Sequence, residues 1–288
     1  METGWETLAL EPTGEGRFGT EIGGAWELAT IPQGGIVAAV AVEAMERVLG
    51  DPGQSLRTLT AIFAGQVAGG EVQVDVQVLR RGRSMSQLTA TVRNPGAEAG
   101  TTVMAAFGQP RRGFEFTELV PPDVEGPEGI RGFRDPLPEG VDFEFLRPPM
   151  PFWEQIIESR PVIGRPPWEP FDPDAPARQV NWMRFDHPPH RPDGSLHIAG
   201  PLVVCDTMPG SVGQKVDPAE GMWFGPSVDY TFHSFGPPAE GWMLIDYKAR
   251  QAGDGYASVE SALWDYADRS APRLVAHACQ QMFFVFGV

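Results

Sequence analysis

The sequence predicts an α+β fold made of two copies of one unit, each a curved antiparallel sheet wrapped around one long helix. Three observations predict it. The two halves of the 288-residue chain carry the same order of expected elements. Each half contains one segment suited to a buried helix. The segments after each helix alternate polar and apolar residues, which is typical of antiparallel strands with one buried face.

The first half contains an expected helix at residues 34–49, opened by Gly34 and Gly35. Its first turns, from Ile36 to Val42, are apolar on every side, and such a helix must be buried on most sides. Four strands are expected after it, at residues 57–65, 71–79, 84–94 and 101–108, with a basic turn at residues 80–83.

The second half repeats this order, with a helix expected at 196–214 and strands at 227–235, 242–251, 256–265 and 274–286. Matching elements lie about 169 to about 172 residues apart, and so small a drift indicates a duplicated domain. A curved sheet around one buried helix is the hot-dog arrangement, so we expect a double hot-dog.

A proline-rich stretch separates the halves. Residues 109–176 hold 15 of the 29 prolines. Proline fixes φ and removes a hydrogen-bond donor, so we expect an ordered connector across the surface, with a short strand or helical turn at 152–159. The predicted division is an N-terminal hot-dog at 1–110, a connector at 111–176 and a C-terminal hot-dog at 177–288.

Composition excludes several classes of function. The formal charge of −16 repels polyphosphate, so nucleic acid is not an expected partner. The longest apolar run, Ile36 to Val42, is far shorter than the roughly 20 residues of a membrane span. The N-terminus lacks the basic and apolar regions of a secretion signal. Cys205 and Cys279 each lie in an apolar segment and are expected to be reduced, buried thiols of a cytoplasmic protein.

Several ordered segments carry a resemblance. In the first half they are Pro32-Gln33-Gly34-Gly35, Leu56 to Phe63, Val76 to Ser86 and Val103 to Phe107; in the second they are Arg178 to Trp182, Leu202 to Asp206, Ser227-Val228-Asp229 and Val275 to Gln281. With these segments the sequence resembles the bacterial acyl-CoA thioesterase II family, whose members are double hot-dogs. The resemblance covers most of both halves and fails across the connector.

The resemblance implies a site and an activity. In that family an Asp on the helix, a Ser or Thr opening the next strand and a Gln on the last strand hold a water that attacks the thioester. Asp206, Ser227 and Gln280 match those positions. The strand positions of the first half match Thr58 and Gly108, so the set is complete only in the second half. The implied activity is hydrolysis of medium- to long-chain acyl-CoA to free fatty acid and CoA, with no metal and no cofactor.

Each of the three residues also allows a simpler interpretation. A carboxylate inside an apolar helix needs a partner, so Asp206 is either a base with a perturbed pKa or a surface or capping residue. Ser227 is either a site hydroxyl or a solvated strand end, since no neighbouring His or Lys activates it as a nucleophile. The Gln280 amide orients a water or bonds between strands.

Further candidates are weaker. The free N–H groups where Gly34 and Gly35 open a helix are expected to bind the thioester oxyanion, although a tight turn explains these glycines equally well. The basic turn at 80–83 could meet CoA phosphates but is better explained as solvated charge. The G-x-G-x-x-G match at 14–19 precedes no expected helix. A metal at His187 and His190 is disfavoured by the two prolines between them.

Two classes of function therefore remain: a hydrolase, or a double hot-dog that binds acyl thioesters without turnover. The matching Asp, Ser and Gln favour the hydrolase. We expect the acyl chain to enter between the halves, with Met208, Phe232 and Met282 as possible lining residues. An exposed sheet edge invites pairing, so we also expect a homodimer or a higher homo-oligomer.

Overall fold

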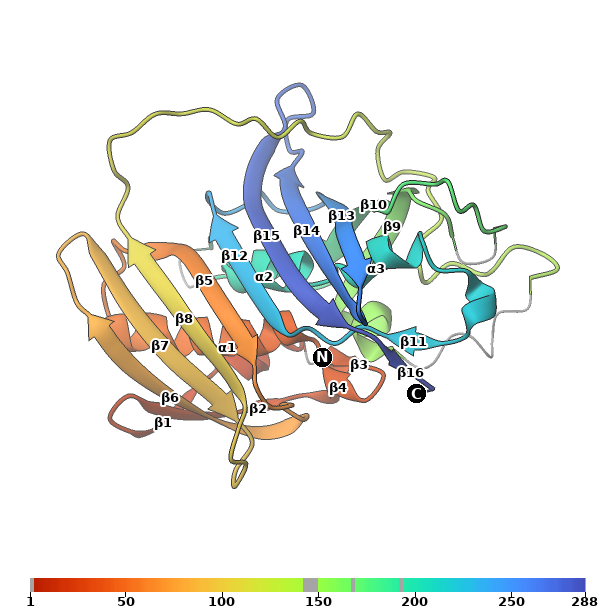
Figure 1. The fold of residues 1–288 in the computed structure, drawn as a ribbon. Coiled ribbons are helices and arrows are strands. Elements are labelled where there is room, and N and C mark those ends of the chain that lie inside the picture. The colour runs from red at the N-terminus through yellow and green to blue at the C-terminus, as the bar shows by residue number, and fades with distance from the viewer. Residues whose placement is uncertain (1–2, 142–149, 167–168, 192–193, 288) are drawn as a thin grey trace.

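A computed structural model describes residues 3–141, 150–166, 169–191 and 194–287 (Figure 1). In these residues, twelve strands form one antiparallel sheet in the order β1-β2-β6-β7-β8-β5-β12-β15-β14-β13-β10-β9. The first six in that order belong to the first half: β1 (Glu11–Gly14), β2 (Arg17–Ile22), β6 (Gly70–Arg80), β7 (Met85–Arg93), β8 (Thr101–Gly108) and β5 (Ser55–Phe63). The other six belong to the second half: β12 (Asp229–Ser234), β15 (Arg273–Phe283), β14 (Tyr256–Asp265), β13 (Met243–Gly253), β10 (Arg178–Phe185) and β9 (Ile157–Ile163).

Short elements complete the chain. Two-stranded sheets form from β3 (Glu27–Leu28) with β4 (Ile31–Pro32), and from β11 (Trp223–Phe224) with β16 (Val285–Phe286). Single helical turns lie at Trp5–Leu8, Gly24–Trp26, Phe152–Ile156 and Pro218–Glu220. Among the described residues, no helix has both the length and the apolar character that crossing a bilayer requires.

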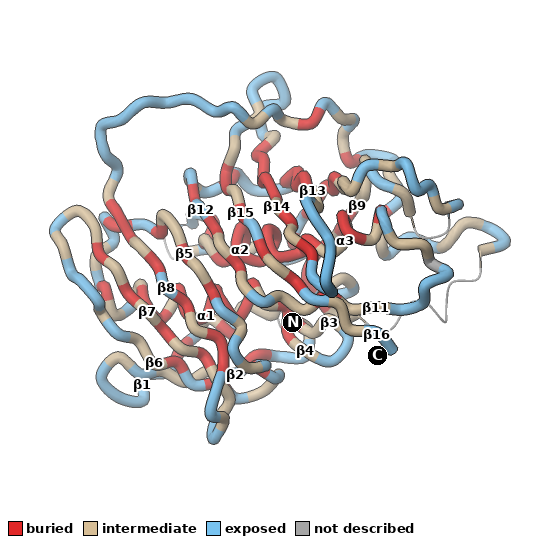
Figure 2. The backbone as a smooth tube through the Cα atoms, viewed as in Figure 1, coloured by how far each residue is buried: buried red, intermediate tan, exposed pale blue. Residues whose placement is uncertain are grey.

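The long helix of the first half is confirmed as α1 (Gly34–Leu49). Eleven of its residues are buried, because the sheet of strands β5 to β8 lies against it (Figures 1 and 2). Gly50, with φ 60°, ends it in the left-handed conformation that glycine adopts without strain.

The single helix expected at 196–214 is wrong. The structure has α2 (Ala199–Cys205) and α3 (Pro209–Gly213), separated by a break. Pro209 explains the break, because proline has no N–H to donate and its ring clashes with the carbonyl four residues earlier, that of Cys205. The Thr207 hydroxyl donates to the Val204 carbonyl at 2.8 Å and closes the end of α2. The break places Asp206 at the C-cap of α2 instead of inside a helix.

The two halves join through one pair of strands. Strand β5 pairs antiparallel with β12, and Thr60 lies opposite Thr231 with the hydroxyl oxygens 3.1 Å apart. The sheets of the two halves are therefore joined side by side into one sheet. The buried residues of α1, α2 and the inner sheet face form one core that crosses the boundary between the halves. Cys205 belongs to this core as expected, but the expected burial of Cys279 is wrong, because its side of β15 faces away from the core and is exposed.

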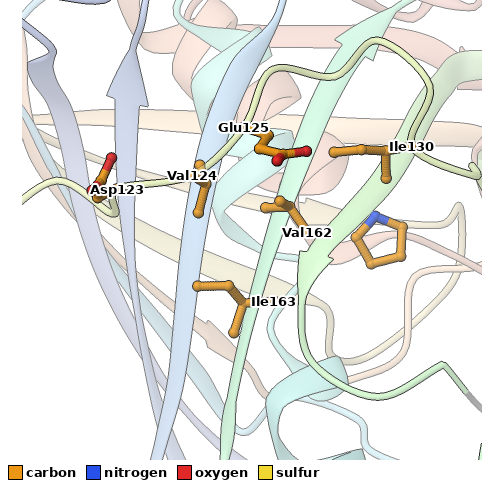
Figure 3. Close-up of a pocket in the computed structure, with 7 residues that line it drawn as sticks. Asp123, Val124, Glu125, Ile130, Val162 and Ile163 are labelled. Carbon is orange, nitrogen blue, oxygen red and sulfur yellow. The ribbon is translucent and has the colours of Figure 1, made fainter.

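The connector does more than cross the surface. The helical turn at Phe152–Ile156 and strand β9 lie inside the expected connector, and β9 pairs with β10 as the last strand of the sheet. Farther upstream, Leu119, Val124 and Ile130 pack on a second cluster around Trp182 and Trp264, on the other side of the sheet from the main core. A pocket of about 460 Å³ lies between residues 123–130 of the connector and β9 (Figure 3). None of the expected site residues lines this pocket. The boundaries at residues 110 and 176 stay a prediction.

Candidate active site

Asp206 belongs to the second half but contacts the helix of the first. The Asp206 Oδ2 accepts a hydrogen bond from the Gly35 N–H at 2.7 Å, and the Asp206 side chain is buried. Gly35 lies in the first turn of α1, where the N–H groups lack intrahelical partners and the helix dipole is positive. The first turn of α1 therefore favours a carboxylate, and the Asp206 side chain binds there.

The surroundings of Asp206 suit a carboxyl group that gains and loses a proton near neutral pH. Burial raises the pKa of Asp206 to about 7, and the Gly35 hydrogen bond opposes the rise. Its second oxygen, Oδ1, is buried without a hydrogen-bond partner among the described residues. A carboxylate with one anchored oxygen and one free acceptor can hold a water and take its proton.

Ser227 and Gln280 form the second part of the site. The Ser227 hydroxyl donates to Gln280 Oε1 at 3.4 Å. Gln280 is buried on the inner face of β15, and its Nε2 has no partner among the residues that the structure describes. Ser227 is placed by an isolated bridge to Met282, two residues beyond Gln280. The hydroxyl therefore fixes the amide orientation and leaves the NH₂ free to donate.

Gly34 links the two parts. A Cβ at Gly34 would lie 2.9 Å from Asp206 Oδ2 and 2.9 Å from Phe63 Cζ, so a larger residue there would force one of these side chains to move. The Phe63 N–H in turn donates to the carbonyl of Val228, the residue after Ser227, at 3.1 Å. A chain of contacts through Gly34 and Phe63 therefore connects Asp206 to the residue after Ser227. That all three predicted side chains meet at one water stays a prediction.

The two glycines differ in what they can still bind. The Gly35 N–H already donates to Asp206, so it is not free to bind a thioester oxygen while that bond exists. The Gly34 N–H makes no hydrogen bond within the described part of the chain. Of the two oxyanion donors expected from the sequence, only Gly34 keeps an unused N–H. The basic turn has a structural partner, because the Arg81 guanidinium donates to the Leu49 and Val48 carbonyls at the end of α1.

The end of α2 is held by side chains that the sequence analysis did not single out as functional. Its last carbonyls would be unpaired in a buried helix end. The Tyr230 hydroxyl donates to Leu202 O at 2.9 Å, Gln33 Nε2 to Val203 O at 3.0 Å, and the Ser261 hydroxyl to Cys205 O at 3.3 Å. These residues come from β12, the start of α1 and β14. No local pattern marks them, because the carbonyls they meet are about 30 to 170 residues away in the sequence.

The first-half counterparts expected at Thr58 and Gly108 are wrong. Strand β6 has a bulge between Val78 and Arg80, and β13 has a bulge between Ala249 and Gln251. The two bulges are equivalent features of the two halves, so matching residues of these strands are 171 apart in sequence. The same offset relates Thr60 to Thr231 and therefore Thr58 to Asp229, not to Ser227. Thr60 pairs with Met104 and Thr231 pairs with Cys279, so Met104 and Cys279 are equivalent positions of the two halves. The next residue in each strand is Ala105 in β8 and Gln280 in β15, so Gln280 corresponds to Ala105. The buried face of β8 contains Val103, Ala105 and Phe107, and Gly108 belongs to the opposite face. Gly108 therefore cannot be the counterpart of Gln280, which lies on the inner face of β15.

One group of metal-type ligands lies away from the predicted site. Ligand atoms of Glu43, Glu46 and His197 lie within 4.8 Å of one another. However, Arg47 pairs with Glu43, and Arg191 pairs with Glu46. The His197 Nδ1 accepts the Ala199 N–H at 3.1 Å, so its Nε2 carries a proton and donates to Glu43. The group is therefore best explained as an ion-pair cluster joining α1 to the start of α2. The metal alternative at His187 and His190 would also have used Asp186 and Asp193, and Asp193 lies outside the described residues.

Comparison with known proteins identifies the family. Residues 22–108 match the acyl-CoA thioesterase N-terminal domain, and residues 127–284 match the acyl-CoA thioesterase C-terminal domain. No functionally curated protein sequence matches the chain.

Solved structures agree on the fold. A hot-dog protein from Alicyclobacillus acidocaldarius is 26% identical with a TM-score of 0.80, and the match covers 100% of each chain. A putative thioesterase II from Thermobifida fusca is 18% identical over 97% of this chain and 96% of that one, with a TM-score of 0.75. Acyl-CoA thioesterase II TesB2 from Mycobacterium marinum is 22% identical over 98% of both chains, with a TM-score of 0.72. Together with the domain matches, these findings show that the chain is a double hot-dog thioester hydrolase and belongs to the acyl-CoA thioesterase family.

Proposed function

We propose that this protein hydrolyses medium- to long-chain acyl-CoA to free fatty acid and CoA, with Asp206, Ser227 and Gln280 as the site that activates water. The proposal rests on two buried atoms without partners, Asp206 Oδ1 and Gln280 Nε2. Leaving each buried polar atom unpaired costs about 1–3 kcal/mol. One is an acceptor and the other a donor, and a water can satisfy both.

The reaction follows from these roles. The water donates one proton toward Asp206 Oδ1 and accepts from Gln280 Nε2, while Ser227 holds the amide in that orientation. Its oxygen attacks the thioester carbonyl as the proton passes to Asp206. The Gly34 N–H is the proposed donor to the resulting oxyanion. The tetrahedral intermediate collapses, the C–S bond breaks, and the CoA thiolate leaves and recovers the proton from Asp206.

The acyl chain is proposed to lie along the seam between the halves. The seam brings α1 of one half against α2 of the other, and the core around it is apolar. Met208, Phe232 and Met282 are fully buried, so they belong to the core and would have to move for a chain to pass among them. Each methylene that leaves water contributes about 0.8 kcal/mol, so kcat/KM should rise with chain length.

A release assay tests the proposal. A thiol reagent would follow CoA release from acetyl-, hexanoyl-, decanoyl- and palmitoyl-CoA, with Asp206→Asn as the matched control. Release that increases with chain length, and that the control lacks, is the expected result. A flat profile, or a preference for acetyl-CoA, would contradict the acyl seam. Tight binding of palmitoyl-CoA without any release would favour the alternative, a non-hydrolytic acyl-thioester-binding protein.

A further inference from the structure

The side-chain amide of Gln33 joins the two helices of the site. Gln33 is the N-cap residue of α1, and its Oε1 accepts from the Ile36 N–H at 3.0 Å. Its Nε2 donates to the Val203 carbonyl in the last turn of α2, also at 3.0 Å. The residue is 1% exposed. Both ends of this buried amide are therefore used, one on the helix of each half.

The turns that Gln33 joins are the ones that meet at Asp206. Gly35, whose N–H donates to Asp206, lies between Gln33 and Ile36, and Asp206 lies three residues after Val203. A Cβ at Gly35 would lie 2.8 Å from Gln33 Oε1 and 2.7 Å from Leu202 O. The amide thus packs directly against the backbone that binds the carboxylate.

We infer that Gln33 is a positioning residue that holds the Gly35 N–H on the Asp206 carboxylate and so sets the strength of Asp206 as a base. This inference rests on the proposed function, in which Asp206 takes the proton from water. Gln33 would not touch substrate; it would act only through the distance between the first turn of α1 and the last turn of α2.

The groups around Asp206 determine how strongly the Gly35 hydrogen bond affects the pKa of Asp206. The titratable groups that interact with Asp206 are Cys205 beside it, Tyr230 from β12 and Tyr247 from β13. Burial raises the pKa of all three, so they are uncharged near neutral pH. The Gly35 N–H is the contact that favours the ionised form of Asp206. A small movement of α1 relative to α2 should therefore change the basicity of Asp206 directly.

Two substitutions test the inference. Gln33→Glu keeps the shape and the acceptor but replaces the donor, and it brings a negative charge beside Asp206. A like charge in such a site raises the pKa of its neighbour, so the midpoint of the pH profile of kcat/KM should rise by at least about one unit. Gln33→Met removes both hydrogen bonds without adding charge. It should lower kcat roughly tenfold and leave KM within about twofold, since only the interaction with the transition state is weakened.

Gln54→Met is the matched control. Gln54 is also buried in the first half, and its Nε2 donates to the Asp51 carboxylate and to the Gly82 carbonyl, so both hydrogen bonds stay within that half. Melting temperatures should fall for both Met variants, whereas kcat should fall only for Gln33→Met. A wild-type pH midpoint in folded Gln33→Glu would overturn the inference. So would an equal loss of kcat in the two Met variants, and this comparison decides alone if Gln33→Glu does not fold. If the wild-type protein releases no CoA, the proposed function fails first, and the inference fails with it.

Discussion

The Gly35 N–H donates to the Asp206 carboxylate across the boundary between the duplicated halves, at 2.7 Å. The two residues are 171 apart in sequence, the same offset that relates the bulge of β6 to the bulge of β13. The proposed site is therefore built between equivalent segments of the two halves and not inside one of them. Each half provides what the other lacks: the first gives a helix start, and the second gives the carboxylate.

Replacing the carboxylate tests the proposed base. Asp206→Asn keeps the size of the side chain and its ability to accept from Gly35, but it cannot take a proton. We expect kcat to fall by about 10²–10⁴, the range of a lost general base. Circular dichroism should show an unchanged fold. Activity within a few-fold of wild type would remove Asp206 from the mechanism.

The pH dependence should follow the raised pKa of Asp206. The ionised form is the base, so kcat/KM should rise with pH and level off above about 7. Stability should run in the opposite direction. Between the ordinary pKa of 3.8 and about 7, the folded protein binds the Asp206 proton and the unfolded chain does not, so this contribution to stability is lost as pH rises.

Denaturant unfolding at pH 4 and pH 7 would measure the stability effect. The free energy of unfolding of Asp206→Asn minus that of wild type should increase from pH 4 to pH 7, because only wild type loses stability as Asp206 ionises. A constant difference across this range would mean that the Asp206 pKa is not raised by folding.

Ser227→Ala tests whether the hydroxyl orients Gln280. The proposed role is indirect, because Ser227 donates to Gln280 Oε1 and leaves Nε2 to the water. Loss of one such hydrogen bond is worth about 1 kcal/mol, so kcat should fall about fivefold to tenfold. Ser227→Thr keeps the hydroxyl and should recover most of the loss. A loss as large as that of Asp206→Asn would instead indicate a direct role in bond making.

Gly35→Ala tests the close approach of the two helices. Its Cβ would lie 2.7 Å from the Leu202 carbonyl and 2.9 Å from Val203 Cα, both on the α2 backbone. Overpacking of this kind costs about 1–3 kcal/mol and should move Gly35 away from Asp206. Thermal unfolding and kcat should therefore both decline. Gly23→Ala is the control, because nothing lies within 4 Å of its Cβ position.

The edge strands of the sheet limit how two chains can associate. The two edges of the sheet are β1, which contains Pro12, and β9, which contains Pro161. Proline at an edge disfavours extension of a sheet by another strand. We therefore expect two chains to associate through faces other than these edges, with a light-scattering mass near twice 31.4 kDa. A mass of one chain at every concentration would contradict association.

The architecture was predictable because its signals are local and repeated. The apolar run in α1 requires burial, and alternation marks the strands that surround it. The break at Pro209 could have been predicted by the same local rule, since a proline inside a helical pattern ends it. The match of Gly108 with Gln280 failed for another reason. A shift of three residues changes which face a strand residue occupies, and sequence similarity alone did not fix the register.

By itself, the sequence determined the duplication, the buried helix and the three polar residues that resemble a thioesterase site. These depend on residue order and periodicity, which folding does not alter. Only the tertiary structure decided that Gly35 binds Asp206, that Gly34 keeps a free N–H, and that Gln33 joins the two helices. Such contacts depend on the angle and distance at which α1 and α2 pack. Packing is set by the whole core at once, so no local pattern in the chain records it.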